Sequence, residues 1–172
     1  MGFVQSSLGW LTRIFQLAAE EEGGMNTPKP PVMALSSPDE AEHQFYEAMQ
    51  RADLDRFMAV WSDEDDVACV HPGGPRLIGV GVIRESFAGI FAKGPLDIHP
   101  EKVRRVDSHF SAVHSVLERV QVQTDKGRQS AWVIATNVYV KTALGWRIVA
   151  HHASPGTTRE AHEVLESGAV LH

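Results

Sequence analysis

The second half of the chain is dominated by long stretches in which apolar and polar residues alternate. Residues 110–123, 128–141 and 146–154 follow this pattern. Asp125-Lys126-Gly127 and Ala143-Leu144-Gly145 separate them and have the composition of tight hairpin turns. A period of two places successive side chains on opposite faces of a sheet. The pattern therefore predicts an antiparallel meander.

The part of the chain that precedes this meander favours helices. Residues 37–52 begin with Ser37 as a capping residue, and Glu40 completes a capping box. Asp53 caps a shorter second helix, and residues 80–92 have the apolar spacing of a third. We expect these helices to cover one face of the sheet.

A short apolar strand, residues 67–71, separates the second helix from the third. Val67, Cys69 and His71 share one of its faces, and a Pro-Gly-Gly turn ends it. A titratable imidazole thus stands at the end of a buried strand. Residues 96–106, which Pro100 interrupts, are a further candidate strand after the third helix. The full order is then α-α-β-α-β-β-β-β, which predicts an α+β fold with a cone-shaped, curved antiparallel sheet and three helices enclosing a pocket.

The predicted domain occupies residues 37–156, between an N-terminal extension with a Pro-rich linker (1–36) and a C-terminal tail (157–172). Residues 1–24 carry an apolar helical stripe, which indicates either a docking helix or an appended extension. Their first six residues fit a myristoylation pattern, which we interpret as chance.

Charge, apolar run length and cysteine content limit the partners and the cellular setting that we expect for this chain. The 172 residues carry a net charge of -6 without a basic run, so we expect no nucleic acid. Apolar runs stay below the roughly 18–20 residues that span a bilayer, so we expect no membrane partner. With Cys69 as the one cysteine, no disulfide can form within the chain, and a reducing, cytoplasmic setting is the simplest interpretation.

Several segments resemble one known family. They are FYEAMQRADLD (45–55), WSDEDDV (61–67), His-Pro-Gly (71–73) and GWRIV (145–149). Together they resemble the SnoaL-like and ketosteroid-isomerase-like branch of the nuclear transport factor 2 superfamily, over residues 37–156. The resemblance implies the cone fold. It implies no single reaction, because this fold carries isomerases, cyclases, dehydratases, hydrolases and non-enzymatic binders.

The resemblance also implies positions for a site. The position of the isomerase base falls on His71, and that of a second oxyanion donor falls on Asn137. The position of the isomerase tyrosine falls on Phe45, which has no hydroxyl, and Tyr46 points about 100° further around the helix. The last strand would turn His151 toward the pocket.

We therefore predict His71 and Asn137 as catalytic side chains. The predicted ligand-binding side chains are Phe45, Tyr46, Trp61, Phe87 and His151. The polar residues also have structural interpretations: His71 could fix its turn, Asn137 could be a buried amide satisfied by its neighbours, and His151 could be a core or interface histidine.

Two functions remain open from the sequence. One is cofactor-free proton transfer, of the isomerase or cyclase type, on a small apolar carbonyl compound. The other is a non-catalytic ligand-binding or dimeric assembly domain. The nine histidines include no metal-binding spacing, and we expect no metal, although His71, His151 and a third ligand remain conceivable.

A homodimer is the expected assembly. Trp132, Ile134, Thr136 and Val138 alternate opposite to Asn137 and form a largely apolar outer face. An extended apolar face of this kind is usually buried against another surface. The sheet-to-sheet homodimer that the family resemblance implies would provide one.

Overall fold

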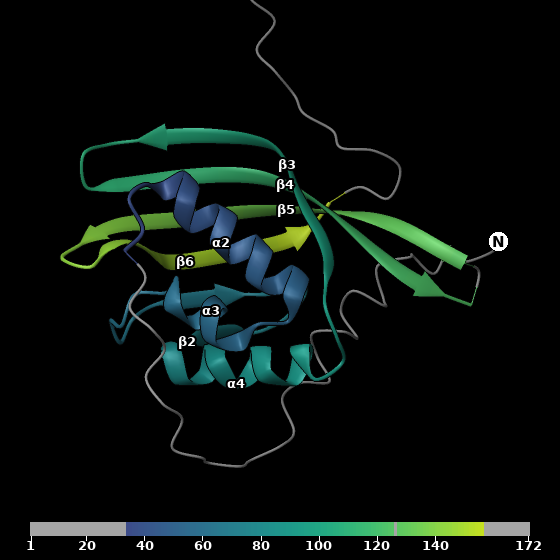
Figure 1. The fold of residues 1–172 in the computed structure, drawn as a ribbon. Coiled ribbons are helices and arrows are strands. Elements are labelled where there is room, and N and C mark those ends of the chain that lie inside the picture. The colour runs from purple at the N-terminus through teal and green to yellow at the C-terminus, as the bar shows by residue number, and fades with distance from the viewer. Residues whose placement is uncertain (1–33, 126, 157–172) are drawn as a thin grey trace, which may run out of the picture.

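The computed structural model describes residues 34–125 and 127–156. In these ranges it contains three helices and six strands (Figure 1): α2 (Pro38–Arg51), α3 (Leu54–Ala59), β1 (Ala68–Val70), β2 (Arg76–Ile78), α4 (Val80–Phe91), β3 (Asp97–Asp107), β4 (Ser111–Thr124), β5 (Gly127–Thr142) and β6 (Gly145–Pro155). The strands form one sheet in the order β2-β1-β6-β5-β4-β3. The predicted α+β class is confirmed.

Two details of the sheet differ from the prediction. Residues 76–78 form an additional short strand, β2, before the third helix. The sheet is mixed rather than wholly antiparallel, because β1 runs parallel to β6 while the other neighbouring pairs are antiparallel. The parallel pair joins the first and the last of the described strands, and alternation within a strand carries no information about which strand it pairs with.

The two predicted helix caps are confirmed. The Ser37 hydroxyl accepts from the backbone N–H of Glu40 at 3.1 Å, and the Asp53 carboxylate accepts from that of Arg56 at 3.0 Å. The capping box is displaced by one residue, however. The carboxylate of Glu40 accepts from the backbone N–H and the hydroxyl of Ser36, at 2.7 and 2.6 Å, instead of closing on Ser37.

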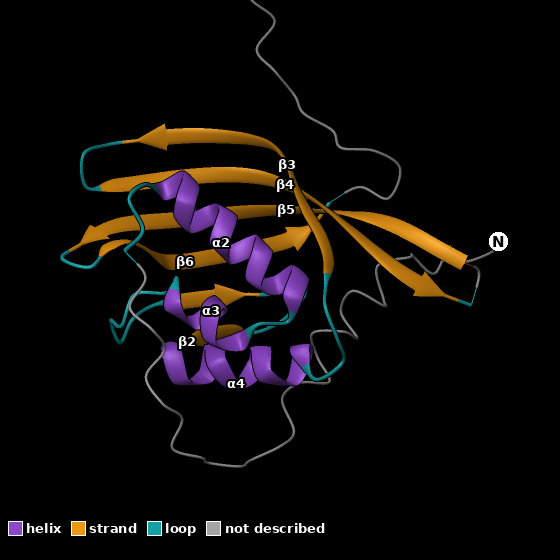
Figure 2. Ribbon diagram, in the orientation of Figure 1, coloured by secondary structure: helices purple, strands orange, loops and turns teal. Residues whose placement is uncertain are grey.

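Helix α2 lies across the concave face of the sheet, and α4 lies beside the β1–β2 end (Figure 2). Strand β3 bends where its register with β4 shifts, between Glu101 and Arg104, and Lys102 within this bulge has a positive φ of 44°. Such a bulge increases local twist and bends a strand. Here it curves β3 around the end of α2, which gives the sheet its cone shape.

The β4–β5 hairpin is longer than its neighbours. Pairing with β3 reaches Gln121 on β4, and pairing with β6 reaches Val133 on β5, whereas β4 and β5 pair with each other as far as Thr124 and Gly127. In the described part of the chain the hairpin tip is therefore only two strands wide, and it projects beyond the body of the sheet (Figure 1).

Packing against the domain includes a residue that precedes the predicted domain boundary. Leu35, in the predicted linker, is 2% exposed and pairs with Gly145 at the start of β6. The predicted N-terminal helix, the myristoylation pattern, the rest of the linker up to residue 33 and the C-terminal tail lie outside the described residues. None of the described helices is long and apolar enough to cross a membrane.

We expect Gly145→Ala to destabilise the protein much more than Gly127→Ala. Both glycines follow tight turns with positive φ, 97° and 93°. A Cβ at Gly145 would lie 2.4 Å from the carbonyl oxygen of Leu35, whereas a Cβ at Gly127 meets nothing within 4 Å. Backbone strain alone costs about 1–2 kcal/mol, and the clash at Gly145 adds the loss of the Leu35 contact. Urea unfolding of the two variants measures the difference, and equal losses would contradict the packing described for Leu35.

Candidate functional site

His71 lies directly after β1, where a tight turn begins. The backbone N–H of Gly74 donates to the carbonyl of His71 at 2.9 Å, which closes the turn. The side chain is 3% exposed, with Nε2 3.1 Å from the hydroxyl of Ser86 on α4. As the alternation predicts, Val67, Cys69 and His71 are all buried on one face.

A shell of aromatic rings connects His71 to the predicted ligand-binding residues. The His71 ring lies 5.1 Å from that of Phe87, which packs on Phe57 at 3.9 Å. Phe57 in turn lies 5.1 Å from Phe45 and 6.2 Å from Trp61. The indole N–H of Trp61 is buried without a hydrogen-bond partner among the described residues.

Asn137 and His151 lie side by side on the inner face of the sheet, paired across β5 and β6. The Asn137 amide oxygen is 2.7 Å from Nδ1 of His151, and the amide nitrogen donates to the Tyr46 hydroxyl at 3.4 Å. This orientation of the amide makes Nδ1 of His151 the donor. His151 also lies 5.2 Å from the Phe45 ring, so the polar group and the aromatic shell meet here.

The structure therefore brings every predicted site residue into one connected cluster. Tyr46 belongs to it through its hydroxyl, although it lies on a different side of α2 from Phe45. Both residues are buried, at 2% and 0% exposure, because α2 has a wide buried face. The proximity of these side chains is established, and their catalytic and binding roles stay predictions.

Glu118, on the inner face of β4, was missed by the sequence analysis. Its side chain is 2% exposed, and Oε1 accepts the Tyr46 hydroxyl hydrogen at 2.8 Å. The hydrogen bonds thus form a chain in which each group donates to the next. His151 donates to Asn137, Asn137 donates to Tyr46, and Tyr46 donates to this carboxylate. A signal was present in the sequence: Glu118 alternates in phase with Val116 and Val120, which are buried.

A second polar cluster, also missed, lies beside the first. Glu42 of α2 accepts from Nδ1 of His114 at 2.9 Å and from the Tyr139 hydroxyl at 3.2 Å. Arg105 bonds Asp39 at 2.6 Å and comes within 4.0 Å of Glu42. Asp39, Glu42 and His114 are close enough together to share a metal ion, but the Arg105 guanidinium already brings positive charge to them.

Burial shifts the pKa values of the site in opposite directions. It lowers the pKa of His71 from 6.5 to about 4 and that of His151 to about 3, the latter with repulsion from His71 and His152. Burial also raises the pKa of Glu118 from 4.5 to about 7. The Tyr46 hydrogen bond opposes this rise, and the charge of Glu42 adds to it. At neutral pH both imidazoles are uncharged, and Glu118 is poised between its two forms.

We expect Glu118→Gln to stabilise the protein increasingly as the pH rises from about 4.5 to 7. In this window the native state holds a proton on Glu118 that the unfolded chain has released, so the wild-type free energy of unfolding falls with pH. The full difference is on the order of 3 kcal/mol above pH 7. Denaturant unfolding of both proteins measures it, and the contributions of His71 and His151 cancel in the comparison.

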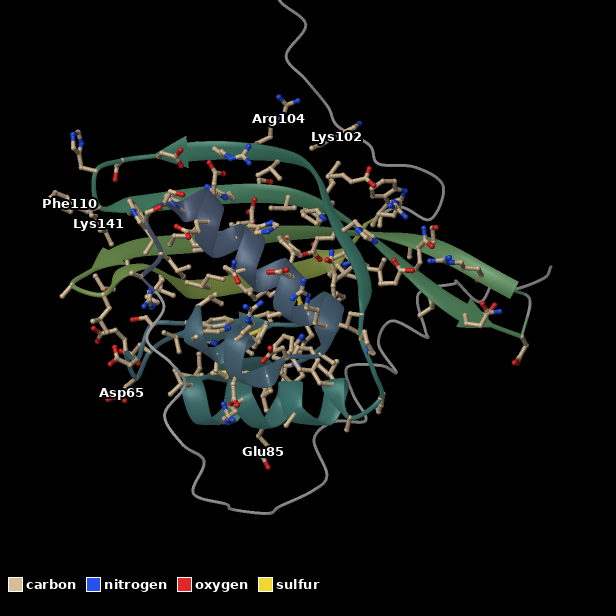
Figure 3. The ribbon with its side chains drawn as sticks, in the orientation of Figure 1. Asp65, Glu85, Lys102, Arg104, Phe110 and Lys141 are labelled. Carbon is tan, nitrogen blue, oxygen red and sulfur yellow. The ribbon has the colours of Figure 1, made fainter. Side chains whose placement is uncertain are left out.

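Glu85→Gln provides the matched control, because Glu85 projects from α4 away from the body of the protein (Figure 3). We expect this variant to follow the wild type at every pH. If the Glu118→Gln difference did not grow with pH, Glu118 would not be a desolvated carboxyl.

Comparison with solved structures returns the same fold. A candidate association domain of calcium/calmodulin-dependent protein kinase type II from Thiobacillus denitrificans is 32% identical, with a TM-score of 0.66, over 73% of this chain and 99% of that one. A candidate dehydratase of the NTF2-like family from Streptomyces avermitilis is 31% identical, with a TM-score of 0.61, over 67% of this chain and 91% of that one. The CaMKII hub of S. rosetta, at 21% identity and a TM-score of 0.57 over 76% of this chain and 100% of that one, shares the fold alone.

Comparison of the sequence points to the same group. A search of curated proteins finds no match. The family model of the SnoaL-like domain matches residues 39–158, which include nearly all of α2 and every later helix and strand described above. The chain belongs to the SnoaL-like domain family, within the NTF2-like superfamily.

Proposed function

We propose that this protein binds a small, largely apolar carbonyl compound inside the cone and transfers a proton at the carbon next to the carbonyl, without a cofactor. The observation that carries the proposal is the meeting of neutral imidazoles and a buried acid-base network with an aromatic shell. Buried titratable groups with shifted pKa values are typical of functional sites. Replacing a whole buried polar network by apolar residues of similar volume often leaves stability unchanged or raises it, so stability alone does not explain the choice of these side chains.

His71 is the proposed base. Burial keeps its imidazole neutral at pH 7, which is the protonation state that a general base requires. Phe87 packs against the ring and Ser86 lies at Nε2, and both orient it. A substrate carbonyl would make the neighbouring C–H acidic enough for a base of this kind only if its oxygen were stabilised at the same time.

The stabilising donors would come from the inner face of the sheet and from α2. The amide of Asn137 interacts with the hydroxyls of both Tyr46 and Tyr139, so it would exchange one of these contacts for the ligand oxygen. The buried indole N–H of Trp61 has no partner among the described residues. An unpaired buried donor costs about 1–3 kcal/mol, which a ligand oxygen would recover. Phe45, Phe87 and the rest of the aromatic shell would contact the apolar body of the ligand.

Deuterium exchange tests this proposal. We expect the protein to accelerate exchange of the methyl protons of acetophenone in D₂O, measured by ¹H NMR. His71→Gln should slow the exchange by about 10²-fold or more, the usual contribution of a general base. His152→Gln is the matched control, because His152 lies on the exposed outer face beside His151 and should exchange like the wild type. Equal rates in the His71 variant would remove His71 from the mechanism.

An assembly function is the second candidate, and the outer face of the sheet favours it. Cross-strand partners form an unbroken apolar row over all six strands, comprising Val106, Val113, Val138, Ala150, Ala68 and Ile78. Val106 is 75% exposed and Ile134, on the same face, 42%. The relative from Thiobacillus denitrificans is named as an association domain. We propose that this face joins two copies of the chain into a homodimer.

We expect Ile134→Lys to raise the monomer fraction in sedimentation velocity, because a lysine there would place charge in the apolar interface. Val82→Lys is the control: Val82 is 47% exposed but lies on α4, away from the sheet's outer face. A monomeric wild type, or an Ile134 variant with unchanged assembly, would refute the interface.

A further inference from the structure

Glu118 and Tyr46 form a buried pair to which the proposed function assigns no step of its own. The phenol donates its hydrogen to Oε1 of Glu118 at 2.8 Å. A phenol carries one hydrogen, so Tyr46 cannot donate to a ligand while it donates to this carboxylate. The structure thus contains a donor whose hydrogen is held by a neighbour that can itself be protonated.

We propose that Tyr46 is the hydrogen-bond donor for the ligand's carbonyl oxygen and that the protonation state of Glu118 decides whether it is available. The ionised carboxylate holds the phenol hydrogen, as in the structure. When Glu118 takes up a proton from solvent, its O–H donates to the phenol oxygen, and the phenol hydrogen turns to the ligand. This inference rests on the proposed small-molecule binding and adds that binding is coupled to uptake of one proton.

The surrounding hydrogen bonds favour this reversal. The phenol oxygen has two acceptor sites, and the Asn137 amide nitrogen approaches one of them at 3.4 Å. The Asn137 oxygen is held by Nδ1 of His151 at 2.7 Å, which fixes the direction of the amide. With Glu118 protonated, donors would reach the phenol oxygen from both sides. The phenol hydrogen is then the one that remains for an acceptor outside the pair.

The groups around Glu118 leave it free to titrate. Helix α2 contributes Tyr46 and the negative charge of Glu42, and β1 contributes the Cys69 thiol, whose pKa is raised by burial and by Glu118. Across the sheet its partners are Pro100 on β3 and Val133 on β5, which are apolar. Burial, supported by Glu42, raises the pKa of Glu118 to about 7, so both protonation states are populated near neutral pH.

The charges of these side chains indicate whether the site would bind a charged or a neutral ligand oxygen. His71 and His151 are neutral, so neither compensates a negative ligand, and Glu42 is a nearby carboxylate. A carboxylate ligand would meet repulsion and an uncompensated desolvation cost. A neutral ketone or aldehyde with an apolar body avoids both, and the aromatic shell suits that body.

The test compares acetophenone with α-methylstyrene, which has the same shape without the carbonyl oxygen. Binding to the full chain is followed by NMR chemical shifts from about pH 5.5 to 8.5. Above the Glu118 midpoint we expect the affinity for acetophenone to fall about tenfold per pH unit, whereas that for α-methylstyrene stays constant. Acetophenone should also raise the titration midpoint of Glu118. The ¹³C chemical shift of the Glu118 carboxyl carbon, recorded against pH, measures that midpoint.

Three variants sharpen the comparison. Tyr46→Phe and Glu118→Gln should both remove the pH dependence, the first with weak binding and the second with tight binding, because an amide N–H can replace the acid proton. Glu42→Gln is the matched control: it neutralises the other buried carboxylate, lowers the midpoint slightly and keeps the pH dependence.

The outcomes separate this inference from the proposed function. Acetophenone binding that does not vary with pH, an unshifted Glu118 midpoint, or a Glu118→Gln variant that still titrates would overturn the inference alone. Failure of wild-type protein to bind either compound at any pH would overturn the proposed function, and the inference with it. The titration of the Glu118 carboxyl carbon uses only wild-type protein. It therefore still decides the question if one of the variants does not fold.

Discussion

The structure depends on the partnering of polar side chains that α2 carries into the interior. Glu42 and Tyr46 lie one helical turn apart, and each bonds side chains of the sheet that are distant in sequence. A buried carboxylate or hydroxyl without a partner costs more than a made hydrogen bond contributes, and the difference is larger for the charged group. The crossing position of α2 is therefore constrained by these hydrogen bonds in addition to its apolar packing.

This constraint divides the interior into two chemically different regions. Toward α3 and α4 the contacts are ring against ring, with Phe57 at the centre. Toward β4 and β5 they are hydrogen bonds among carboxyl, phenol, amide and imidazole groups. Phe45, His151 and Tyr46 lie at the boundary. A molecule with an apolar body and one polar atom matches such a boundary better than either region alone.

The features that the sequence predicted are those with local causes. Capping residues located α2 and α3, apolar spacing located α4, and turn residues with alternation located β4, β5 and β6. Strand β2 was missed because three residues after a turn show no period, and the parallel β1–β6 pairing has no local signature. The β3 bulge at Lys102 likewise depends on how the strand must curve around α2.

The site shows the same division. Alternation grouped Asn137 with residues that are buried, and the family resemblance turned His151 toward the pocket. Alternation applied equally to His114 and Glu118. Those two were passed over because charged and polar residues in a strand are usually exposed. Their burial becomes predictable only once Glu42 and Tyr46 are known to lie above them, which is a tertiary fact. The angular offset between Phe45 and Tyr46 is real, but burial of both sides of α2 makes it no obstacle to Tyr46 joining the site.

The long β4–β5 hairpin has a consequence for local stability. Near Asn137 each strand of this pair has neighbours on both sides and a helix above, so its amides can exchange with solvent only through large-scale unfolding. Beyond Gln121 and Val133 the same two strands form a narrow ribbon with exposed edges, and opening there disturbs little else. The most protected and the least protected amides of the sheet are thus expected on the same pair of strands, with the change occurring over a few residues.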